Sequence, residues 1–423
     1  MRRRCGNYKN FLAAKRLQST GEATEIGRVT DGEIFARHYA TGQPGRVSWR
    51  QGIITACEAA STPPDGDVWL APALVDLQVN GFAGVDFQQD NVTVDQLLEA
   101  TRALRAFGCA RYLLTLITDE WPKLTARLKR LRQLRRSSLE LERAIAGWHV
   151  EGPFLSAEPG FHGAHNPALM LDPAPDHIRE LRAITDTDPL LLTIAPERQG
   201  ALEAIALATS LGVRVSLGHT NASAEILRQA VRAGATGFTH LGNACPQQLD
   251  RHDNILWRVL DTRGLAVSLI PDQIHVSPAL FRLIHRALPS DSICYITDAM
   301  AAAGASPGRY TIGSLKVVVG EDQIVRQPGG PNYAGSALRP MDGVFRAAQM
   351  LGCPWQDVWD GFSIRPARFA GFEVDLVCGR SADFCLIEFS GAELSAEVKL
   401  FVRGAAVERR RIKGPGHNVA NGV

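Results

Sequence analysis

No hydrophobic run in this chain approaches the roughly 18 residues that a membrane-spanning helix requires. The basic opening, residues 1–20, also lacks the apolar stretch of roughly 7 to 15 residues that marks a secretory signal. We therefore expect a cytoplasmic protein with no membrane partner, whose residues 1–20 form a disordered tail.

The chain also has no excess of charge of either sign, with 46 Lys and Arg against 44 Asp and Glu, and a net charge of +2. This balance gives no general case for a nucleic-acid partner, so an anionic ligand would have to be bound by a local group of cations. The eight cysteines include no CxxC pair and no short disulfide-rich spacing. Reduced thiols are the simplest interpretation.

The composition, 45% hydrophobic and 21% charged, is that of a globular protein with a sizeable core. From about Glu33 to Trp69, short β-prone segments alternate with turns rich in Gly and Pro. A similar pattern of β-prone segments occurs near the end of the chain. We predict that residues 21–70 and 376–423 together form one small β-sandwich domain. Residues 71–375 would then form the catalytic domain.

Within residues 71–375, eight apolar strand-like runs alternate with amphipathic stretches such as residues 94–108 and 221–234. The runs are ALVDLQV, YLLTLI, AIAGWHV, LLLTI, VRVSLG, GFTH, LAVSLI and ICYIT. This alternation is typical of βα units and a parallel sheet, and eight such units close a barrel. The predicted fold class is therefore α/β, a (β/α)8 TIM-like barrel with the small β domain attached.

Barrel enzymes carry their active sites just past the carboxyl ends of the strands. Those positions hold the following polar residues: Gln78, Asn80, Glu151, His219, His240, His275 and Asp298. A carboxylate and two imidazoles, from Glu151, His219 and His240, suit one divalent ion and leave a coordination position open for water. Zinc is the first expectation, with iron, cobalt and manganese as alternatives.

Asp298 could then take a proton from a water and deliver it to a leaving nitrogen. Each residue has a plainer alternative, because a lone strand-end histidine is often structural and both Glu151 and Asp298 could cap a turn or helix. Those alternatives leave unexplained why the four residues gather on different strands. The sequence thus favours a metal-dependent hydrolase.

Several motifs occur in order from about Trp69 to Ile387: VDLQVNGFAGVDF, HVEGPF, GAHNP, TIAPE, SLGHTNAS, THLGNAC, ITDAMAAAG, YAGSAL and SADFCLIE. Together they resemble the signature blocks of the N-acetylglucosamine-6-phosphate deacetylases, which are amidohydrolases. The resemblance implies that Glu151, His219 and His240 bind the catalytic metal and that Asp298 is the general base and acid. It further implies that His165 of GAHNP polarises the acetamide carbonyl, for which a solvated loop histidine is the alternative.

The resemblance also implies substrate contacts from Asn243, Ala244 and His275. Gln78 and Asn80 stand where many amidohydrolases carry an HxH pair for a second metal, so one metal per chain is expected. Amides bind such metals poorly. A purely structural role, as hydrogen-bonding strand ends, is the alternative for both amides.

The stretch after His240 departs from the family, reading LGNACPQQLDRHDNILW where NAM and an R-E-P-G run are usual. Arg251 keeps the spacing of the family's phosphate-binding arginine, which the resemblance places across a homodimer interface. An intrachain pair between Arg251 and Asp253 is the alternative. The expected substrate is the small-molecule amino-sugar phosphate N-acetylglucosamine 6-phosphate, with another N-acyl amino sugar or related amide, or a non-catalytic binding barrel, as alternatives.

Overall fold

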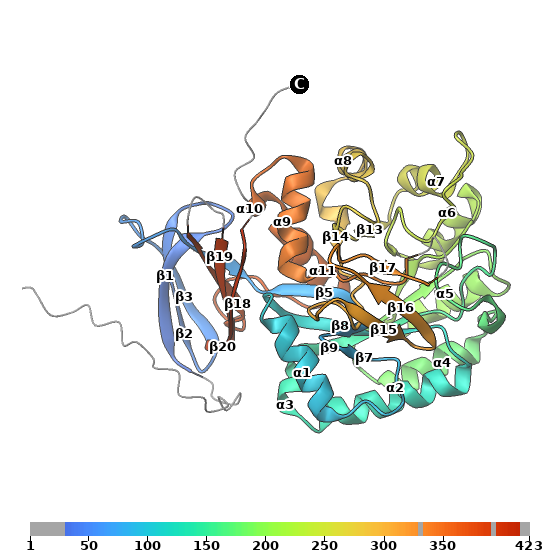
Figure 1. Cartoon of the computed structure of the whole chain (residues 1–423), viewed down its shortest axis with the longest axis horizontal. Helices are drawn as coiled ribbons and strands as arrows, with labels where there is room; N and C mark the ends of the chain where they lie inside the picture. Colours follow the sequence, from blue (N-terminus) through green and yellow to red (C-terminus); the bar gives the residue numbers. More distant parts are fainter. Residues whose placement is uncertain (1–29, 329–332, 391–394, 415–423) are drawn as a thin grey trace, which may run out of the picture.

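The computed structural model of the protein describes residues 30–328, 333–390 and 395–414. The expected tail at residues 1–20 lies outside these ranges. At the centre is an eight-stranded parallel sheet in the order β14-β13-β12-β11-β10-β9-β8-β5 (Figure 1). Its strands are β5 (Leu74–Val79), β8 (Cys109–Ile117), β9 (Ile145–Glu151), β10 (Leu190–Ile194), β11 (Arg214–Leu217), β12 (Gly237–Phe238), β13 (Ala266–Leu269) and β14 (Ile293–Tyr295).

The sheet closes on itself between its first and last strands. An isolated parallel bridge joins Val79 to Ala299, and the amide of Asn80 donates to the Ala299 carbonyl at 2.7 Å. Nearer the start of β5, the buried Asp76 carboxylate accepts from the Thr297 hydroxyl at 2.6 Å. The eight predicted strand runs and the predicted (β/α)8 barrel are thus confirmed.

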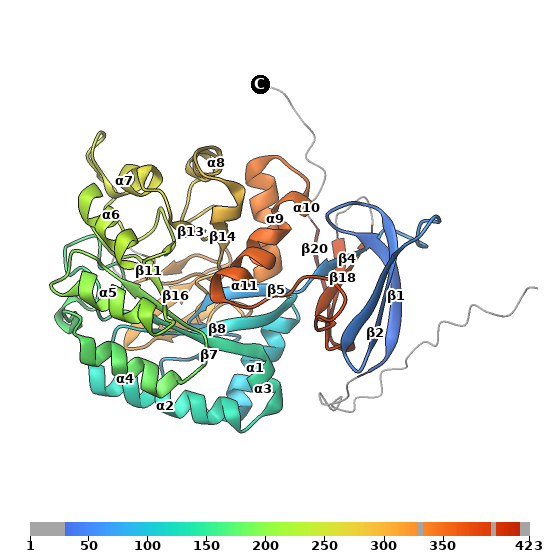
Figure 2. The same ribbon diagram turned by 180° about the vertical axis from the view of Figure 1, so that it is seen from behind.

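Helices form the outer layer around the barrel (Figures 1 and 2). They are α1 (Val94–Arg105), α2 (Trp121–Arg136), α3 (Leu139–Ala144), α4 (Pro175–Thr185), α5 (Ala201–Ser210), α6 (Ala224–Ala233), α7 (Ile255–Asp261), α8 (Pro278–Ala287), α9 (Pro340–Leu351), α10 (Trp355–Val358) and α11 (Ile364–Ala370). The two predicted helices are present as α1 and α6. In α1, Thr93 caps the first turn through Gln96, and Leu97, Ala100 and Leu104 bury one face, as an amphipathic helix should.

Both ends of the chain build a second, seven-stranded sheet in the order β20-β19-β18-β4-β1-β2-β3. Its strands are β1 (Gly32–His38), β2 (Pro44–Arg50), β3 (Ile53–Ala59), β4 (Val68–Pro72), β18 (Phe384–Ser390), β19 (Ser395–Val402) and β20 (Ala405–Lys413). Trp49 of β2 packs against Phe384 of β18 and Phe401 of β19, with ring centroids 5.4 and 6.2 Å apart. Because these strands are not neighbours in the sheet, the sheet must curl over its own core, which gives the expected sandwich-like unit. The boundaries at 70/71 and 375/376 stay a prediction.

A small hairpin sheet over the catalytic end was not predicted from the sequence. It contains β15 (Gly308–Ile312), β16 (Leu315–Val319) and β17 (Val325–Arg326). Asp86 ends β7 (Val85–Asp86), which pairs with the short strand β6 (Gly81–Phe82), and its carboxylate accepts from the Gly313 amide at 3.0 Å. This contact fixes the β15–β16 turn above the barrel mouth.

No helix in the described ranges is long and apolar enough to cross a membrane. The cytoplasmic location stays a prediction. Seven of the eight cysteines are described and none of them is in a disulfide, while Cys5 lies outside the described residues.

Candidate active site

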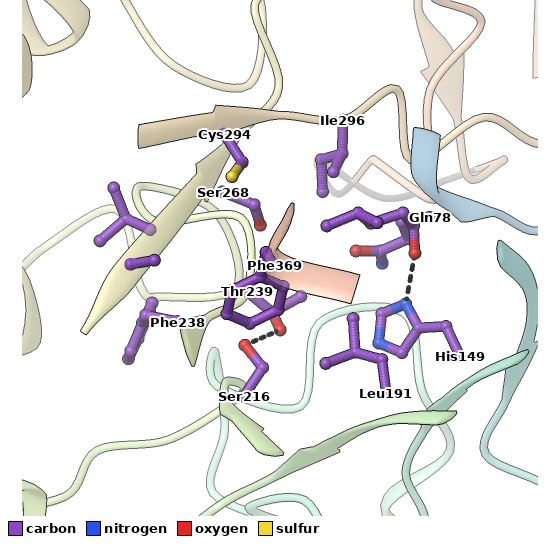
Figure 3. A pocket seen from close by; sticks show the side chains of 13 residues that line it. Gln78, His149, Leu191, Ser216, Phe238, Thr239, Ser268, Cys294, Ile296 and Phe369 are labelled. Atoms are coloured by element: carbon purple, nitrogen blue, oxygen red, sulfur yellow. Dashed lines mark hydrogen bonds between the residues drawn. The ribbon is translucent and has the colours of Figure 1, made fainter. Parts of the chain in front are cut away.

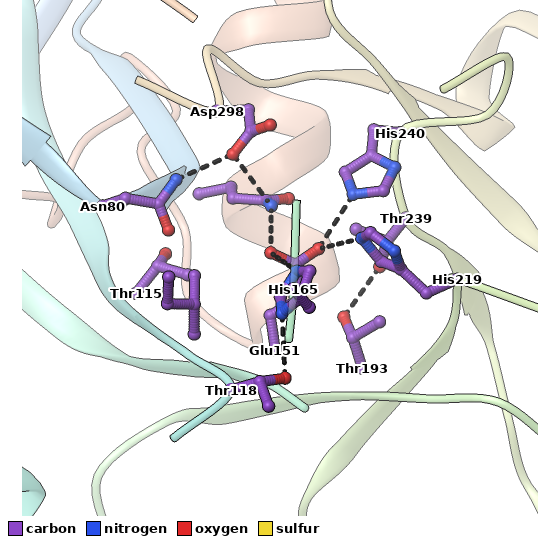
Figure 4. Close-up of polar contacts among 12 residues, drawn as sticks. Asn80, Thr115, Thr118, Glu151, His165, Thr193, His219, Thr239, His240 and Asp298 are labelled. Carbon is purple, nitrogen blue, oxygen red and sulfur yellow. Dashed lines mark hydrogen bonds and ion pairs between the residues drawn. The ribbon is translucent and has the colours of Figure 1, made fainter. Parts of the chain in front are cut away.

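Glu151 is the centre of a buried polar cluster at the carboxyl end of the barrel (Figure 4). It is the last residue of β9, so its side chain enters the barrel mouth. Its Oε1 lies 2.8 Å from His240 Nε2 and 3.4 Å from His219 Nε2, and its Oε2 lies 3.7 Å from His165 Nε2. The strand ends and the loop after β9 thus bring one carboxylate and three imidazoles together.

The outer nitrogens of two of these imidazoles are held by neighbouring groups. His219 Nδ1 lies 2.9 Å from the Phe161 carbonyl, so Nδ1 carries the proton and Nε2 is left to face Glu151. His165 Nδ1 lies 2.8 Å from the Thr118 hydroxyl. The loop that carries His165 passes so close to His219 that a Cβ on Gly163 would lie 2.9 Å from the His219 ring, and Gly163 also has φ +58°. Only glycine fits such a position comfortably.

These donors fit a divalent metal ion. Two ligands of a tetrahedral ion, each at about 2.1 Å, lie about 3.4 Å apart, which is the spacing of Glu151 Oε1 and His219 Nε2. Glu151, His165 and His219 form a buried group whose ligand atoms all lie within 4.8 Å of one another. His240 approaches the same Glu151 oxygen more closely, at hydrogen-bond distance, and its inclusion in the ligand set stays a prediction.

Asp298, the proton carrier expected from sequence, lies beside Glu151 in the same buried cluster (Figure 4). Burial, and then the nearby Glu151 charge, raise the pKa of Asp298 to about 6. Burial alone would also raise the pKa of Glu151, but the neighbouring imidazoles of His219 and His240 hold it well below the usual value. Two neighbouring carboxylates therefore differ: Glu151 stays ionised as a ligand should, while Asp298 can exchange a proton near neutral pH.

Gln78 and Asn80 connect the two carboxylates. Gln78 Nε2 donates to Glu151 Oε2 at 2.9 Å and to Asp298 Oδ1 at 3.1 Å. Asn80 Nδ2 donates to the same Asp298 oxygen at 2.7 Å. The Gln78 amide thus lies between the two acids, while the Asn80 amide contacts Asp298 alone. This arrangement supports the hydrogen-bonding role that was the alternative for both residues.

Several of these side chains stand on left-handed backbone. His219, His240, Ala244 and Asp298 have φ of 50°, 37°, 50° and 51°. Non-glycine residues adopt such values at a cost that surrounding packing must offset, and they cluster at functional sites. The concentration of four at this barrel end marks it as the functional site.

The pocket above Glu151 and Asp298 is also lined by Asn243, Ala244 and Tyr333. His275 lies at its edge, with its ring 5.5 Å from that of Tyr333. Its Nδ1 lies 2.6 Å from the Asp272 carboxylate, and its buried Nε2 has no partner among the described residues. His275 is therefore held in place by Asp272 with one nitrogen free for a ligand.

Arg251 is not part of this pocket within its own chain. It is exposed, and its carbonyl accepts from Trp257 Nε1 at 3.2 Å. The alternative of an Arg251–Asp253 pair is wrong, because Asp253 pairs with Arg258 at 2.6 Å. Arg258 lies on α7, in the last turn of this short helix, and its side chain reaches back to Asp253.

Below the carboxylates, the barrel interior holds a chain of buried polar groups (Figure 3). His149 Nδ1 lies 3.1 Å from the Leu77 carbonyl and its Nε2 lies 2.8 Å from the Thr193 hydroxyl. Thr193 contacts Thr239 at 2.8 Å, and Thr239 donates to Ser216 at 2.7 Å. Burial lowers the pKa of His149 to about 4, so it is neutral and serves to hold the strands below the site.

The comparisons with known proteins agree with this geometry. No family model matches the chain. The N-acetylglucosamine-6-phosphate deacetylase of Bos taurus is 33% identical over 346 residues, which cover 77% of this chain and 81% of that relative. This chain belongs to the N-acetylglucosamine-6-phosphate deacetylase family.

A second curated relative and a solved structure support this assignment. The N-acetylgalactosamine-6-phosphate deacetylase of Escherichia coli O157:H7 is 32% identical over 332 residues, 78% of this chain and 85% of the relative. The structure of a variant of the Mycobacterium smegmatis N-acetyl-D-glucosamine-6-phosphate deacetylase, in complex with N-acetyl-D-glucosamine-6-phosphate, has a TM-score of 0.79 and 29% identity. It covers 90% of this chain and 100% of its own. The protein is thus a hydrolase of the metal-dependent amidohydrolase superfamily.

Three residues that complete this site were missed at the sequence level. Thr118 holds His165, Asp272 holds His275, and Tyr333 stands beside His275. Thr118 and Asp272 do follow predicted strands, so their position after β8 and β13 was a usable signal. Tyr333 follows no strand, since it lies in the long connection between β17 and α9, and its only signal was its place at the start of the YAGSAL motif.

Proposed function

We propose that this protein hydrolyses the acetamide of N-acetylglucosamine 6-phosphate, releasing acetate and glucosamine 6-phosphate. The observation that carries the proposal is the pair of buried carboxylates with opposite pKa shifts, one within reach of three imidazoles. This arrangement joins a metal ligand set to an acid–base group, as amide hydrolysis requires.

Glu151, His219 and His240 would hold one divalent ion, for which zinc is the first candidate. A divalent ion bound there lowers the pKa of a water and polarises an amide carbonyl. Gln78 and Asn80 fill the neighbouring space with amide donors, which supports one ion per chain rather than two.

Asp298 would accept a proton from the attacking water and return it to the leaving nitrogen. Asn80 and Gln78, both donating to Asp298 Oδ1, leave Oδ2 for this transfer. The proton is needed on nitrogen because an amine leaves far more readily than an amide anion.

His165 would donate a hydrogen bond to the scissile carbonyl oxygen. Burial lowers the pKa of His165 to about 3, so the ring is neutral and carries one proton. For Nε2 to hold that proton, the Thr118 hydroxyl must donate to Nδ1. Thr118 therefore sets the tautomer that the mechanism needs.

The sugar would lie over Asn243 and Ala244, with His275 Nε2 accepting from a hydroxyl group. The phosphate would be bound by Arg251 of a second chain in a homodimer, which agrees with the exposure of Arg251 and its lack of an ion pair in the described part of this chain. Guanidinium and phosphate form two parallel charged hydrogen bonds.

A second candidate substrate is N-acetylgalactosamine 6-phosphate. It is favoured by the similarity to a relative named for that activity and by the divergent segment at residues 241–254, which borders the sugar side. The test is kcat/KM for the two phosphorylated epimers and for unphosphorylated N-acetylglucosamine. We expect the glucosamine epimer to be preferred; preference for the galactosamine epimer would reassign the substrate, and activity on none would favour a non-catalytic barrel.

A further inference from the structure

A cavity of about 270 Å3 lies at the opposite end of the barrel from the catalytic pocket, where the strands begin. It lies between the starts of β8, β9 and β10 and the turn that joins β19 to β20. Its lining residues are Ala110, Arg111, Arg135, Glu142, Arg143, Ala146, Pro189, Phe372, Ser381, Asp383, Val402 and Arg403. None of them lines the catalytic pocket.

Four arginines but only two acidic residues face this cavity. Arg111 is paired with Asp383 at 2.8 Å, and Arg135 is paired with Asp188 at 2.9 Å. Asp383 is buried and has little capacity left, because its other oxygen accepts from Ser381 at 2.7 Å and from the Arg403 amide at 2.8 Å. Two arginines therefore remain to be accounted for.

The guanidinium groups of Arg143 and Arg403 have no ion-pair partner among residues 30–328, 333–390 and 395–414. Arg403 Nε is buried and lacks any hydrogen-bond partner there, and so does Arg135 Nε on the same cavity. Burial, and then the nearby charge of Arg403, lower the pKa of Arg143. Asp383 and Glu142 offset part of this effect. Neither of them forms an ion pair with Arg143 or Arg403 in the described residues, so these two guanidinium groups lack a paired counter-charge.

The backbone holds Arg403 in this place despite its cost. Arg403 has φ 49°, a left-handed conformation that glycine or asparagine adopts more easily. Its amide is fixed by the Asp383 carboxylate, so the turn delivers the guanidinium to the cavity wall. Arg143 comes from the last turn of α3, just before β9.

We propose that this cavity binds a small phosphate-bearing anion between Arg143 and Arg403. Each guanidinium can give phosphate two parallel charged hydrogen bonds. The site is separate from the phosphate contact proposed for Arg251, since it uses the other end of the barrel.

The test is isothermal titration of the full chain with inorganic phosphate, with chloride holding the ionic strength constant. Arg143→Gln should weaken one class of phosphate sites about tenfold, the effect of losing one charged hydrogen-bonding group. Arg50→Gln removes an exposed arginine at the end of β2 and is the matched control, so it should bind as the unchanged protein does. Arg403→Asn should behave as Arg143→Gln, because asparagine keeps the left-handed turn.

Glycerol 3-phosphate as a second probe separates the two sources of the anion. If glycerol 3-phosphate binds more tightly than inorganic phosphate, and Arg143→Gln removes this difference, the natural ligand is a phosphate ester. If the two probes bind equally, it is free phosphate. The proposal is overturned if Arg143→Gln and Arg403→Asn, both folded by circular dichroism, bind phosphate as Arg50→Gln does. Phosphate binding that does not saturate, or chloride binding of equal strength, would also overturn the proposal.

Discussion

Non-glycine residues with left-handed backbone occur both in the sheet built from the two chain ends and at the barrel mouth, but for different reasons. In the sheet, Gln51 and Arg403, with φ of 47° and 49°, each open a two-residue turn between antiparallel strands. Each is followed by a glycine, Gly52 or Gly404, as expected for the tight turns that suit the twist of a hairpin. Local sequence rules largely explain these positions.

At the barrel mouth the same conformation is taken by His219, His240 and Asp298. No turn type calls for an imidazole or a carboxylate there, and each residue costs more than glycine would. The surrounding strands and buried hydrogen bonds must therefore hold these residues in place. Left-handed backbone is thus kept, despite its cost, at positions where the side chain takes part in the chemistry.

The largest expected effect comes from removing a metal ligand. His219→Ala and His240→Ala should each abolish metal retention and activity, because two of three proposed ligands cannot hold the ion tightly. Elemental analysis after gel filtration measures it. Gln78→Ala is the control and should keep about one metal per chain; a His240→Ala protein that keeps its metal would point to His165 as the third ligand instead.

Asp298→Asn should come next, with kcat lowered about 10²- to 10⁴-fold while metal content and fold are kept. An amide of the same shape neither accepts nor returns the proton. Steady-state kinetics on metal-loaded protein would measure the loss. Near-normal kcat would mean that another group transfers the proton.

Arg251→Ala should raise KM for the phosphorylated sugar about tenfold, as expected for a lost hydrogen bond to a charged group. Activity on the unphosphorylated sugar should hardly change. Asp253→Asn, which breaks the neighbouring pair with Arg258, is the matched control. Equal losses on both substrates would remove the phosphate role.

The pH profile should report Asp298. Burial raises the pKa of Asp298 to about 6, so its proton-accepting form is lost as pH falls through that value, and kcat/KM should fall with it. A metal cation bound nearby would favour the ionised Asp298 carboxylate and so shift this acid limb of the profile to lower pH. Asn80 donates to the ionised form, so Asn80→Ala should move the limb up by about one pH unit; an unmoved limb would contradict the assignment to Asp298.

The smallest effect is expected in the outer sheet. Gln51→Gly should raise the free energy of unfolding by about 0.5 kcal/mol, since relief of left-handed strain slightly exceeds the added entropy of glycine. Gln51→Val, in contrast, should lower it. Urea denaturation followed by fluorescence measures both changes. A less stable Gln51→Gly protein together with a more stable Gln51→Val protein would show that this turn obeys no local rule.

The eight barrel strands and the meeting of Glu151, His219 and His240 could be predicted because strand periodicity and strand-end position are local signals. The β15–β17 hairpin sheet could not, because short strands within a long connection resemble loops. The arginine-lined cavity was hidden for another reason. Arg111, Arg143 and Arg403 are far apart along the chain and meet only when β18–β20 pack against the start of the barrel.

The Arg251–Asp253 alternative failed for a similar reason. Proximity along the chain favoured that pair, but Arg258 on α7 reaches Asp253 once the helix forms. The partner of Asp253 is thus set by the position of α7, and the sequence after His240 did not predict this helix.

The most direct test of the account is acetate release from N-acetylglucosamine 6-phosphate as metal is returned to the chelated protein. We expect activity to rise linearly and to saturate at about one metal per chain, with acetate and glucosamine 6-phosphate formed in equal amounts. No acetate from fully loaded protein, or activity that needs two metals per chain, would contradict it.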